Sequence, residues 1–534
     1  MEFSGVNTAR LAATAGLCAA LIGGGLSVPA VAFAAPNPDY QEISATLDEN
    51  TLDDAFAVTS DDRALAASPN DGGSGEDANT GVEDAVAQVG DVTYSSLPDA
   101  LAAACESSGT VTLLKSVELS APLEITQGSA TIDLAGFTIK PAAETINYPL
   151  SVKAGASLGI KDSSAGKTGQ VLGGKQGVAL VMGGLNLESG SLFSTSTYGV
   201  FLTGDKPSMT MTGGSVRAAV EGIRGQFGAS IVISGGTVES TNKDISAGAV
   251  TLLGSSLEIS GTASLKGFCG VGLFNLSYSN SEPNKPVVDN VKDGVNYPSS
   301  IKMSGGSIET SVYAISGNNG QSATCSAEIT GGTLKSTDTC IYWPMEGNLT
   351  ISGDSYIEGA TAVEAKMGTI NVSGGTLVGT GESGSNYTGN GESSDGSALK
   401  LVGQLYGASE GQCLGSPNLV AKVTGGTFTS AHGNAVAVYN AGVETAFGSS
   451  ERLASSITVA SSATMEPAEG KDPLRVTSAQ DDYKLTDAGV STGNTTIVND
   501  GVAKAAAGVQ GVTTVDQNKK EQTSYPCTPR STTR

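Results

Sequence analysis

The chain has 534 residues, with 53 Asp or Glu against 29 Lys or Arg, and its formal net charge is −24. Because a chain of this charge without a basic stripe is repelled by phosphates, a nucleic-acid partner is not expected. One Trp and an aromatic content of 5% point to a narrow core rather than a broad aromatic one.

Residues 1–34 have the features of a secretory signal peptide. Arg10 precedes a long apolar run, and the small-residue pattern Ala32-Phe33-Ala34 stands before Ala35. This order of a basic residue, an apolar segment and a cleavage site is typical of exported proteins. We therefore expect a secreted or bacterial cell-surface location, with an uncleaved membrane anchor as the alternative.

Residues 35–85 form an acidic leader. Between residues 36 and 84 there are 13 acidic side chains and a single basic one, Arg63. Segments with this much like charge and little apolar content stay disordered. We expect a solvated spacer, and binding to calcium or to a basic surface is the alternative.

Residues 86–109 are expected to cap an ordered domain. Ser96-Leu97-Pro98-Asp99 is a capping-box start for a short Ala-rich helix that ends near Cys105. Short β-rich runs follow from Thr110 onward. The helix can therefore cover the first turn of a β structure, whose bare edge would invite aggregation.

The rest of the chain is built from a repeat, of which residues 231–240 (IVISGGTVES) are one unit. Its first glycines recur roughly every 21 to 26 residues, with two gaps about twice as long, and this is the turn length of a β-solenoid. Further clear copies begin at Met209, Ile301, Ala327, Ile370 and Ala421.

Three positions in each unit are apolar. They lie two residues before the first glycine, three residues after it and ten residues after it, as Ile233, Val238 and Ile245 do around Gly235. Apolar side chains at these positions define three inward-facing strands in each turn. The Gly-Gly pair provides the corner, where the backbone can adopt positive φ.

Several segments resemble exported Gram-positive surface proteins that carry a right-handed parallel β-helix of the pectate-lyase-like superfamily. The matching motifs are Tyr94 to Ala100, Thr110 to Lys115 and Ile132 to Ile139, together with the Ser/Thr-Gly-Gly-Ser/Thr units. The resemblance covers residues 86–465. It implies an all-β fold, a right-handed three-faced parallel β-helix over residues 110–465, with about 14 to 15 turns and a length of roughly 70 Å.

Residues 466–534 are expected to be a polar C-terminal tail. They contain neither a sortase signal nor a long apolar span, so no transmembrane segment is expected once the signal peptide is removed. The cysteines lack a paired C-x-x-C spacing, and no structural zinc, other metal or cofactor is expected. Cys269 and Cys340 fall on second strands and are expected to pack as small apolar residues.

Catalysis on such a scaffold would need Asp or Glu side chains that project together from neighbouring turns. Asp244 and the single His, His432, have no such acidic partner in the repeat, and we interpret both as surface residues. No catalytic residue is assigned. The sequence therefore favours a non-catalytic, adhesin-like protein, and a secreted polysaccharide lyase or glycoside hydrolase is the alternative.

Charged residues four positions after the first glycine alternate in sign from unit to unit. Arg217 is followed by Glu239, and Glu309 is followed by Lys335. In a parallel stack with matched register, these residues become neighbours about 4.8 Å apart. We expect them to fix the register more than the stability, because exposed ion pairs contribute little.

Aromatic residues near two long insertions form the predicted ligand site. The insertions span residues 275–300 and 403–417 and leave the solenoid at the corner after the second strand. The Trp lies at the same corner, on a solenoid turn between them. A Trp flanked by tyrosines can stack on a sugar or anchor a peptide, so glycans or host surface proteins are the expected partners of an expected monomer. The alternative is that the Trp only covers an apolar corner. The predicted ligand-binding residues are Trp343, Tyr342, Tyr278, Tyr297 and Tyr406.

Overall fold

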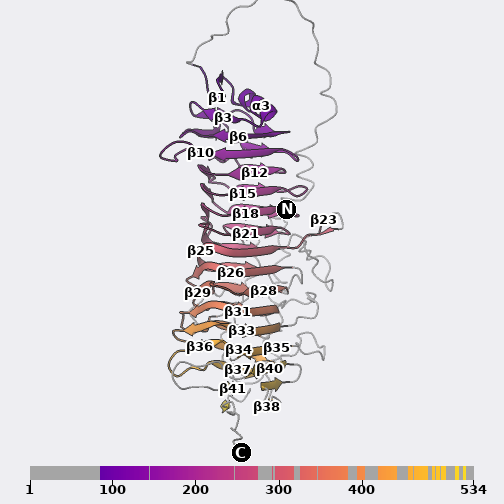
Figure 1. Ribbon diagram of the computed structural model, residues 1–534, viewed down its shortest axis with the longest axis vertical. Coiled ribbons are helices and arrows are strands. Elements are labelled where there is room, and N and C mark those ends of the chain that lie inside the picture. The colour runs from indigo at the N-terminus through magenta and orange to yellow at the C-terminus, as the bar shows by residue number, and fades with distance from the viewer. Residues whose placement is uncertain are drawn as a thin grey trace, which may run out of the picture.

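The computed structural model shows a long rod in which strands lie across the axis and stack on one another (Figure 1). The predicted signal peptide and residues 35–83 of the leader lie outside the described residues. The residues described are 84–143, 145–245, 247–274, 291–292, 295–317, 325–345, 347–382, 394–402, 419–441, 455–460, 462–478, 484–486, 489–492, 495–500, 512–515 and 521–524.

The strands form three columns, and within each column every strand pairs in parallel with the strand of the next turn. This topology is a parallel β-helix, so the predicted all-β fold is confirmed. The first column runs through β3 (Thr110–Leu113), β6 (Ser129–Asp133), β9 (Ser157–Lys161), β12 (Gly184–Leu187), β15 (Ser208–Met211), β18 (Ser230–Ile233), β21 (Ser256–Ile259), β25 (Ser300–Gly317), β26 (Ser326–Ser336), β28 (Asn348–Ile351), β31 (Gly368–Gly379), β33 (Leu419–Ser430), β35 (Ser455–Ala460) and β40 (Thr495–Asp500).

The longest strands belong to more than one column, because they continue around a corner. The second column is β4 (Val117–Leu119), β7 (Thr138–Pro141), β10 (Gln170–Leu172), β13 (Ser191–Phe193), β16 (Ser215–Ala218), β19 (Thr237–Ser240), β22 (Ser264–Leu273), β25, β26, β29 (Tyr356–Gly359), β31, β33 and β36 (Thr464–Glu466). The third is β5 (Leu123–Ile125), β8 (Leu150–Val152), β11 (Gly177–Val181), β14 (Tyr198–Leu202), β17 (Glu221–Gln226), β20 (Val250–Leu253), β22, β25, β27 (Ile341–Trp343), β30 (Val363–Ala365), β32 (Leu399–Val402), β34 (Val436–Ala441), β37 (Leu474–Ser478) and β41 (Val512–Val515).

The core is the column of side chains enclosed by the three strand columns. Ile233 and Val238 are fully buried, as the repeat predicts. Ile245 is not in this core, so that prediction is wrong. Val250 takes the inward place in register with Ile223, because residues 241–249 separate β19 from β20 in the sequence, whereas only residues 219 and 220 separate β16 from β17.

The buried cysteines behave as small apolar residues, as predicted. Cys269 lies in β22 and Cys340 directly precedes β27, and neither forms a disulfide. Burial raises the pKa of Cys269 to about 12 and also raises the pKa of Cys340. Since the thiolate is the reactive form, both side chains are inert packing groups.

A helix caps the N-terminal end of the rod. Helix α3 (Leu97–Ser107) begins after the N-cap Ser96, whose Oγ accepts a hydrogen bond from the Asp99 backbone N–H at 3.4 Å. Strands β1 (Ala87–Val89) and β2 (Val92–Tyr94) form a hairpin, and β1 pairs antiparallel with β3. The helix and hairpin cover the first turn, as the sequence predicts (Figure 1).

The ladder continues beyond Met465, where the polar tail was expected to begin. β37 pairs in parallel with β34, β40 with β35, and β41 with β37. β38 (Lys484–Thr486), β39 (Gly489–Thr492) and β42 (Glu521–Ser524) add antiparallel pairs at this end, and β23 (Val291–Lys292) and β24 (Val295–Asn296) form a projecting hairpin (Figure 1).

The number of turns is slightly smaller than predicted. From β3 to β35 the first column holds thirteen strands, against the 14 to 15 turns expected over the same residues. At about 4.8 Å per turn, this part of the rod is about 60 Å long. The difference arises because the insertions occupy sequence without adding a turn.

Candidate functional site

The predicted aromatic ligand site is not an exposed surface. Trp343 and Tyr342 are both fully buried, so the prediction that they stack on a ligand is wrong. Trp343 belongs to the main core, where it lies in register with the small Ala365 of the next turn. Ile341 points inward, and a continued strand of period 2 turns Trp343 inward as well.

Of the other residues of that predicted site, the structure describes only Tyr297. Tyr297 is half-buried and packs edge-on against Phe227, with 5.8 Å between ring centroids. Tyr278 and Tyr406 lie outside the described residues. His432 is exposed, as expected, and Asp244 is partly exposed.

The outer side of the second column carries a continuous line of hydroxyl groups, which we call the hydroxyl ladder. The last Ser or Thr of each Ser/Thr-Gly-Gly-Ser/Thr unit lies in the second column directly before a residue that points inward, as Ser215 does before Val216. Ser215 Oγ donates a hydrogen bond to Ser191 Oγ at 3.0 Å. The hydroxyl ladder is Ser191, Ser215, Thr237, Ser264, Ser307, Thr333, Tyr356, Thr376, Thr427 and Thr464, all partly exposed.

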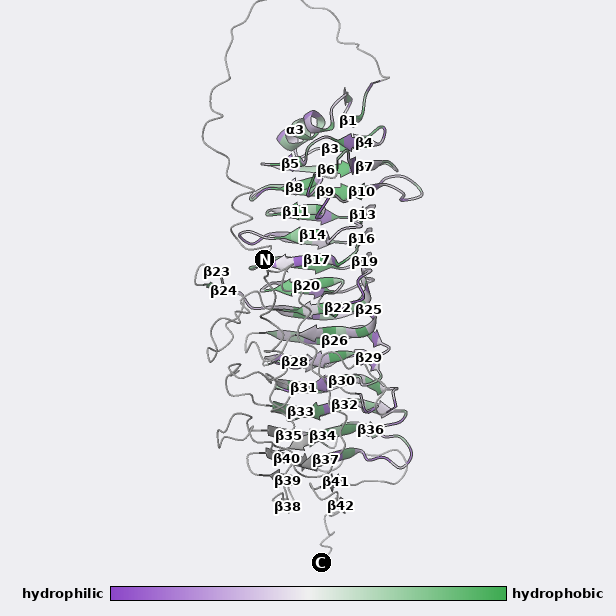
Figure 2. Ribbon diagram, turned by 180° about the vertical axis from the view of Figure 1, so that it is seen from behind, coloured by the Kyte–Doolittle hydropathy of each residue, from purple (hydrophilic) through white to green (hydrophobic). Residues whose placement is uncertain are grey.

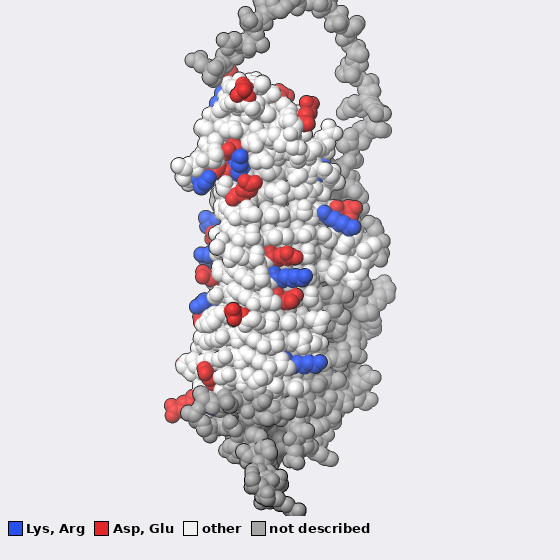
Figure 3. All heavy atoms as spheres, in the orientation of Figure 1, with Lys and Arg blue, Asp and Glu red and all other residues white. Residues whose placement is uncertain are grey.

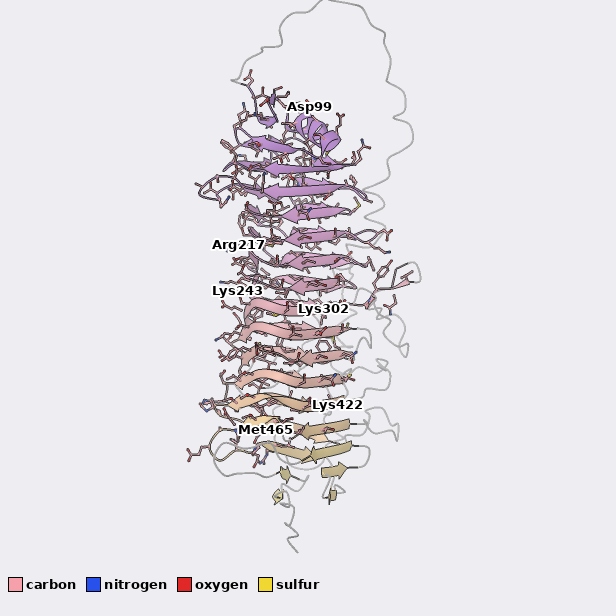
Figure 4. The ribbon with its side chains drawn as sticks, in the orientation of Figure 1. Asp99, Arg217, Lys243, Lys302, Lys422 and Met465 are labelled. Carbon is pink, nitrogen blue, oxygen red and sulfur yellow. The ribbon has the colours of Figure 1, made fainter. Side chains whose placement is uncertain are left out.

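A second line of side chains runs parallel to the hydroxyl ladder, two residues further along each strand. We call it the charge ladder, and it consists of Arg217, Glu239, Lys266, Glu309, Lys335 and Glu358 in register order. The predicted column of Arg217 with Glu239 and of Glu309 with Lys335 is therefore confirmed. Figure 4 labels Arg217 at the left edge of the rod, and Figure 3 shows blue and red groups alternating down that edge.

A shallow groove lies where the two ladders begin. Its volume is about 360 Å³. The half-buried ring of Phe193 forms part of its wall, and the guanidinium of Arg217 lies 5.8 Å from the ring centroid. The groove is lined by Gln170, Ser191, Phe193, Ser215, Val216, Arg217, Thr237 and Glu239. These groups can form hydrogen bonds with a polar ligand, and the ring adds a small apolar contact.

The outer side of the third column is different, because every residue of β11, β14 and β17 is buried. Figure 2 shows these three strands stacked along the rod. Arg224 contacts Glu221 at 3.3 Å, and its guanidinium also lies over the rings of Tyr198 and Phe201 at 5.6 and 5.9 Å. Burial raises the pKa of Glu221, although the neighbouring Arg224 favours its charged form. Arg224 therefore balances a carboxylate that burial disfavours.

Further along the same column, a second charged group is buried against aromatic rings. Glu364 is fully buried, with Oε1 3.6 Å from Lys366 Nζ and Oε2 3.4 Å from Lys400 Nζ. Lys366 Nζ lies 5.3 Å from the centroid of Tyr342, which stacks on Tyr313. The repeat pattern does not predict these buried residues, although apolar runs such as Tyr198–Leu202 are typical of strands buried on both sides.

The carboxylates of Glu221 and Glu364 cannot act together on one glycosidic bond. β17 and β30 are five steps apart in the third column, through β20, β22, β25 and β27, which places Glu221 and Glu364 about 24 Å apart. Paired carboxyl groups in glycosidases lie at most about 9.5 Å apart. Each carboxylate instead forms an ion pair within its own part of the column.

The comparisons with known proteins add no relative. No family model matches the chain, and no curated protein and no solved structure matches it. Within the described ranges, no helix is both long and apolar enough to span a membrane. Across those same ranges, no group of three or more His, Cys, Asp or Glu side chains is placed to hold a metal ion.

Proposed function

We propose that this chain is a non-catalytic, adhesin-like protein of the secreted or cell-surface class, and that it binds an extended glycan or host protein along its second column. The observation that carries the proposal is the register of the two ladders, which places polar side chains on the same lines from turn to turn along the rod. A repeating surface fits an extended ligand better than a compact one.

Two further observations support this assignment. The signal-like residues 1–34 and the acidic leader favour export, and the motifs at Tyr94 to Ala100 and Ile132 to Ile139 resemble exported Gram-positive surface proteins. The groove beside Phe193 gives the ligand a place to begin, since it combines hydroxyl donors, a cation and part of an aromatic ring.

A bulky substitution in the groove tests the proposal. In Ser215→Trp, the indole fills the groove from a partly exposed position, and we expect binding to a glycan array or to host cells to fall at least about tenfold, which is 1.4 kcal/mol. Ser208→Trp is the matched control, because Ser208 is exposed on the first column of the same turn, outside both ladders. Its binding should equal that of the unmodified chain.

The same samples distinguish binding from catalysis. Glycans that bind are incubated with the chain, with and without Ca²⁺, and are assayed for new reducing ends and unsaturated products. Binding without product supports the proposal. Turnover of any glycan would replace it with the lyase or hydrolase alternative, and equal binding by the two Trp variants would remove the groove from the site.

A further inference from the structure

The charge ladder has a symmetry that ligand binding does not require. Its six side chains alternate strictly between cation and anion, beginning with Arg217 and ending with Glu358. Three contacts along the rod axis join consecutive members, at 3.4 Å between Arg217 and Glu239, 3.8 Å between Lys266 and Glu309, and 3.3 Å between Lys335 and Glu358. These side chains keep between 29% and 56% of their surface exposed, so a second molecule can reach them.

The ladder is also locally neutral on a chain whose formal net charge is −24. Three cations and three anions share one stripe of the surface, whereas the chain as a whole repels a second copy of itself. Like charges placed opposite each other cost free energy at an interface, and complementary ones favour it. The stripe is therefore a part of the surface where two copies can approach without a net repulsion.

An alternating ladder with an even number of members is complementary to itself when the second copy is reversed. A two-fold rotation about an axis perpendicular to the rod places the first member opposite the sixth, the second opposite the fifth and the third opposite the fourth. Arg217 then faces Glu358 of the second copy, and Lys266 faces Glu309 of the second copy. Every facing pair has opposite charges, and the interface is isologous.

We propose that two copies of this chain associate side by side through the charge ladder, in antiparallel orientation. A parallel alignment at the same height would place like charges opposite each other at every turn, so the ladder selects the reversed orientation. The adjacent hydroxyl ladder contributes neutral groups, such as Ser264 and Ser307, that can donate or accept hydrogen bonds across the contact.

The association should be weak and sensitive to salt. The contact is small and made of exposed charges, so a dissociation constant in roughly the micromolar to millimolar range is expected. The chain then remains the predicted monomer at low concentration. This inference fits the proposed surface location, because rods that project from two facing surfaces meet in antiparallel orientation. Many weak contacts between such rods can add up to a strong attachment.

Sedimentation velocity of the purified full chain over a concentration series tests this proposal. We expect reversible dimers at about 0.15 M salt and mostly monomers at about 1 M, where the Debye length falls to about 3 Å. Lys266→Glu should weaken dimerisation at least about tenfold, because two like-charge contacts then replace two attractive ones. Lys302→Glu changes the net charge equally on the first column, where Lys302 is exposed between Glu258 and Glu328, and should leave dimerisation unchanged.

A charge swap identifies the orientation. In Lys266→Glu with Glu309→Lys, the reversed copy again faces an opposite charge at both positions, so dimerisation should return. A parallel pairing shifted by one turn would instead gain two like-charge contacts, and dimerisation would stay weak. Circular dichroism and thermal unfolding show that each variant is folded. A wild-type chain that stays monomeric at all concentrations, a dimer indifferent to Lys266→Glu, or a swap without recovery would each overturn the proposal.

Discussion

Asp162 shows how one side chain can organise a corner of the rod. The side chain is 1% exposed, and its Oδ2 accepts a hydrogen bond from the Gly169 N–H at 2.6 Å. Its Oδ1 accepts from the Gly136 and Ser164 N–H groups at 2.8 and 3.0 Å. Burial opposes ionisation, but these hydrogen bonds outweigh it and hold the pKa of Asp162 below its ordinary value.

The lowered pKa gives stability a defined dependence on pH. In the unfolded chain Asp162 titrates near its ordinary pKa of about 4. Because its folded-state pKa is lower, the stabilisation is fully present above the unfolded-state value and is lost as pH falls through the folded-state value. Asp162→Asn should lower the free energy of unfolding at pH 7 by about 2 kcal/mol or more, since an amide cannot replace a carboxylate that accepts three hydrogen bonds.

Urea unfolding of this variant at pH 7 and near pH 2 checks the prediction. The difference from the unmodified chain should shrink at the lower pH. Asp354→Asn is the control, because Asp354 is exposed and its loss should change stability by no more than about 0.5 kcal/mol. An Asp162→Asn chain as stable as the control at pH 7 would contradict the role of this carboxylate.

The position of Trp343 within its strand explains why the ligand-site prediction failed. The repeat correctly placed Ile341 inward, but Trp343 was assigned to a corner instead of to the next inward position of the same strand. Its indole fits because Ala365 follows it in register. A single sequence gives the alternation along a strand, but not where the strand ends, and the strand end decides whether an aromatic residue is core or surface.

The Gly-Gly corner is the element that the clear copies of the repeat share. In the pair Gly235-Gly236, only Gly236 has a positive φ, of 82°. A Cβ on Gly235 would lie 2.3 Å from the Thr212 carbonyl oxygen of the preceding turn. The first glycine is therefore needed because adjacent turns approach closely, and the second because the backbone is left-handed.

Alanine substitutions can separate these two effects. Gly236→Ala should destabilise the chain by about 2 kcal/mol or more, because a left-handed alanine costs about 1 kcal/mol and its Cβ would also lie 2.6 Å from the Gly214 carbonyl oxygen. Gly155 is the matched control, with φ of 81° and no atom within 4 Å of an added Cβ.

Chemical denaturation of both variants gives the comparison. Gly155→Ala should show only the cost of backbone strain, about 1 kcal/mol. Equal losses in the two variants would mean that the close stacking of turns at the corner contributes nothing.

At the level of strands, the sequence predicted the first two columns well and the third less well. The positions beside the glycine pair are fixed by the corner, so Ile233 and Val238 were placed correctly. The number of residues before the third strand varies, and the longer stretch between Ser240 and Val250 places Val250 instead of Ile245 at the inward position. The charge ladder was partly foreseen, because four of its six members lie four residues after the first glycine, whereas Lys266 and Glu358 lie five residues after it.

For the whole molecule, the repeat predicted the rod but not its end. Met465 ends the last segment that resembles a repeat unit, yet β37, β40 and β41 continue the parallel ladder beyond it. Pairing with an existing strand edge provides the hydrogen bonds, so a strand can join the stack without the corner sequence. The insertions likewise reduced the number of turns without disturbing the register on either side.

One continuous β-helix keeps the register of its strands on both sides of the insertions, and this register creates both ladders. Thr376 and Thr427 are register partners in β31 and β33, although residues 377–426 separate them in the sequence. Neighbours in a parallel pair lie about 4.8 Å apart, within the range of a disulfide. Phe428, the next residue, is fully buried and faces the core.

The most direct measurement is therefore peptide mapping of disulfides after mild oxidation of Thr376→Cys combined with Thr427→Cys. We expect positions 376 and 427 to be joined in the folded chain. Thr376→Cys combined with Phe428→Cys should give no such link, because the two side chains point to opposite sides of the sheet. Absence of the disulfide between positions 376 and 427, or equal formation of the one between positions 376 and 428, would contradict a continuous β-helix.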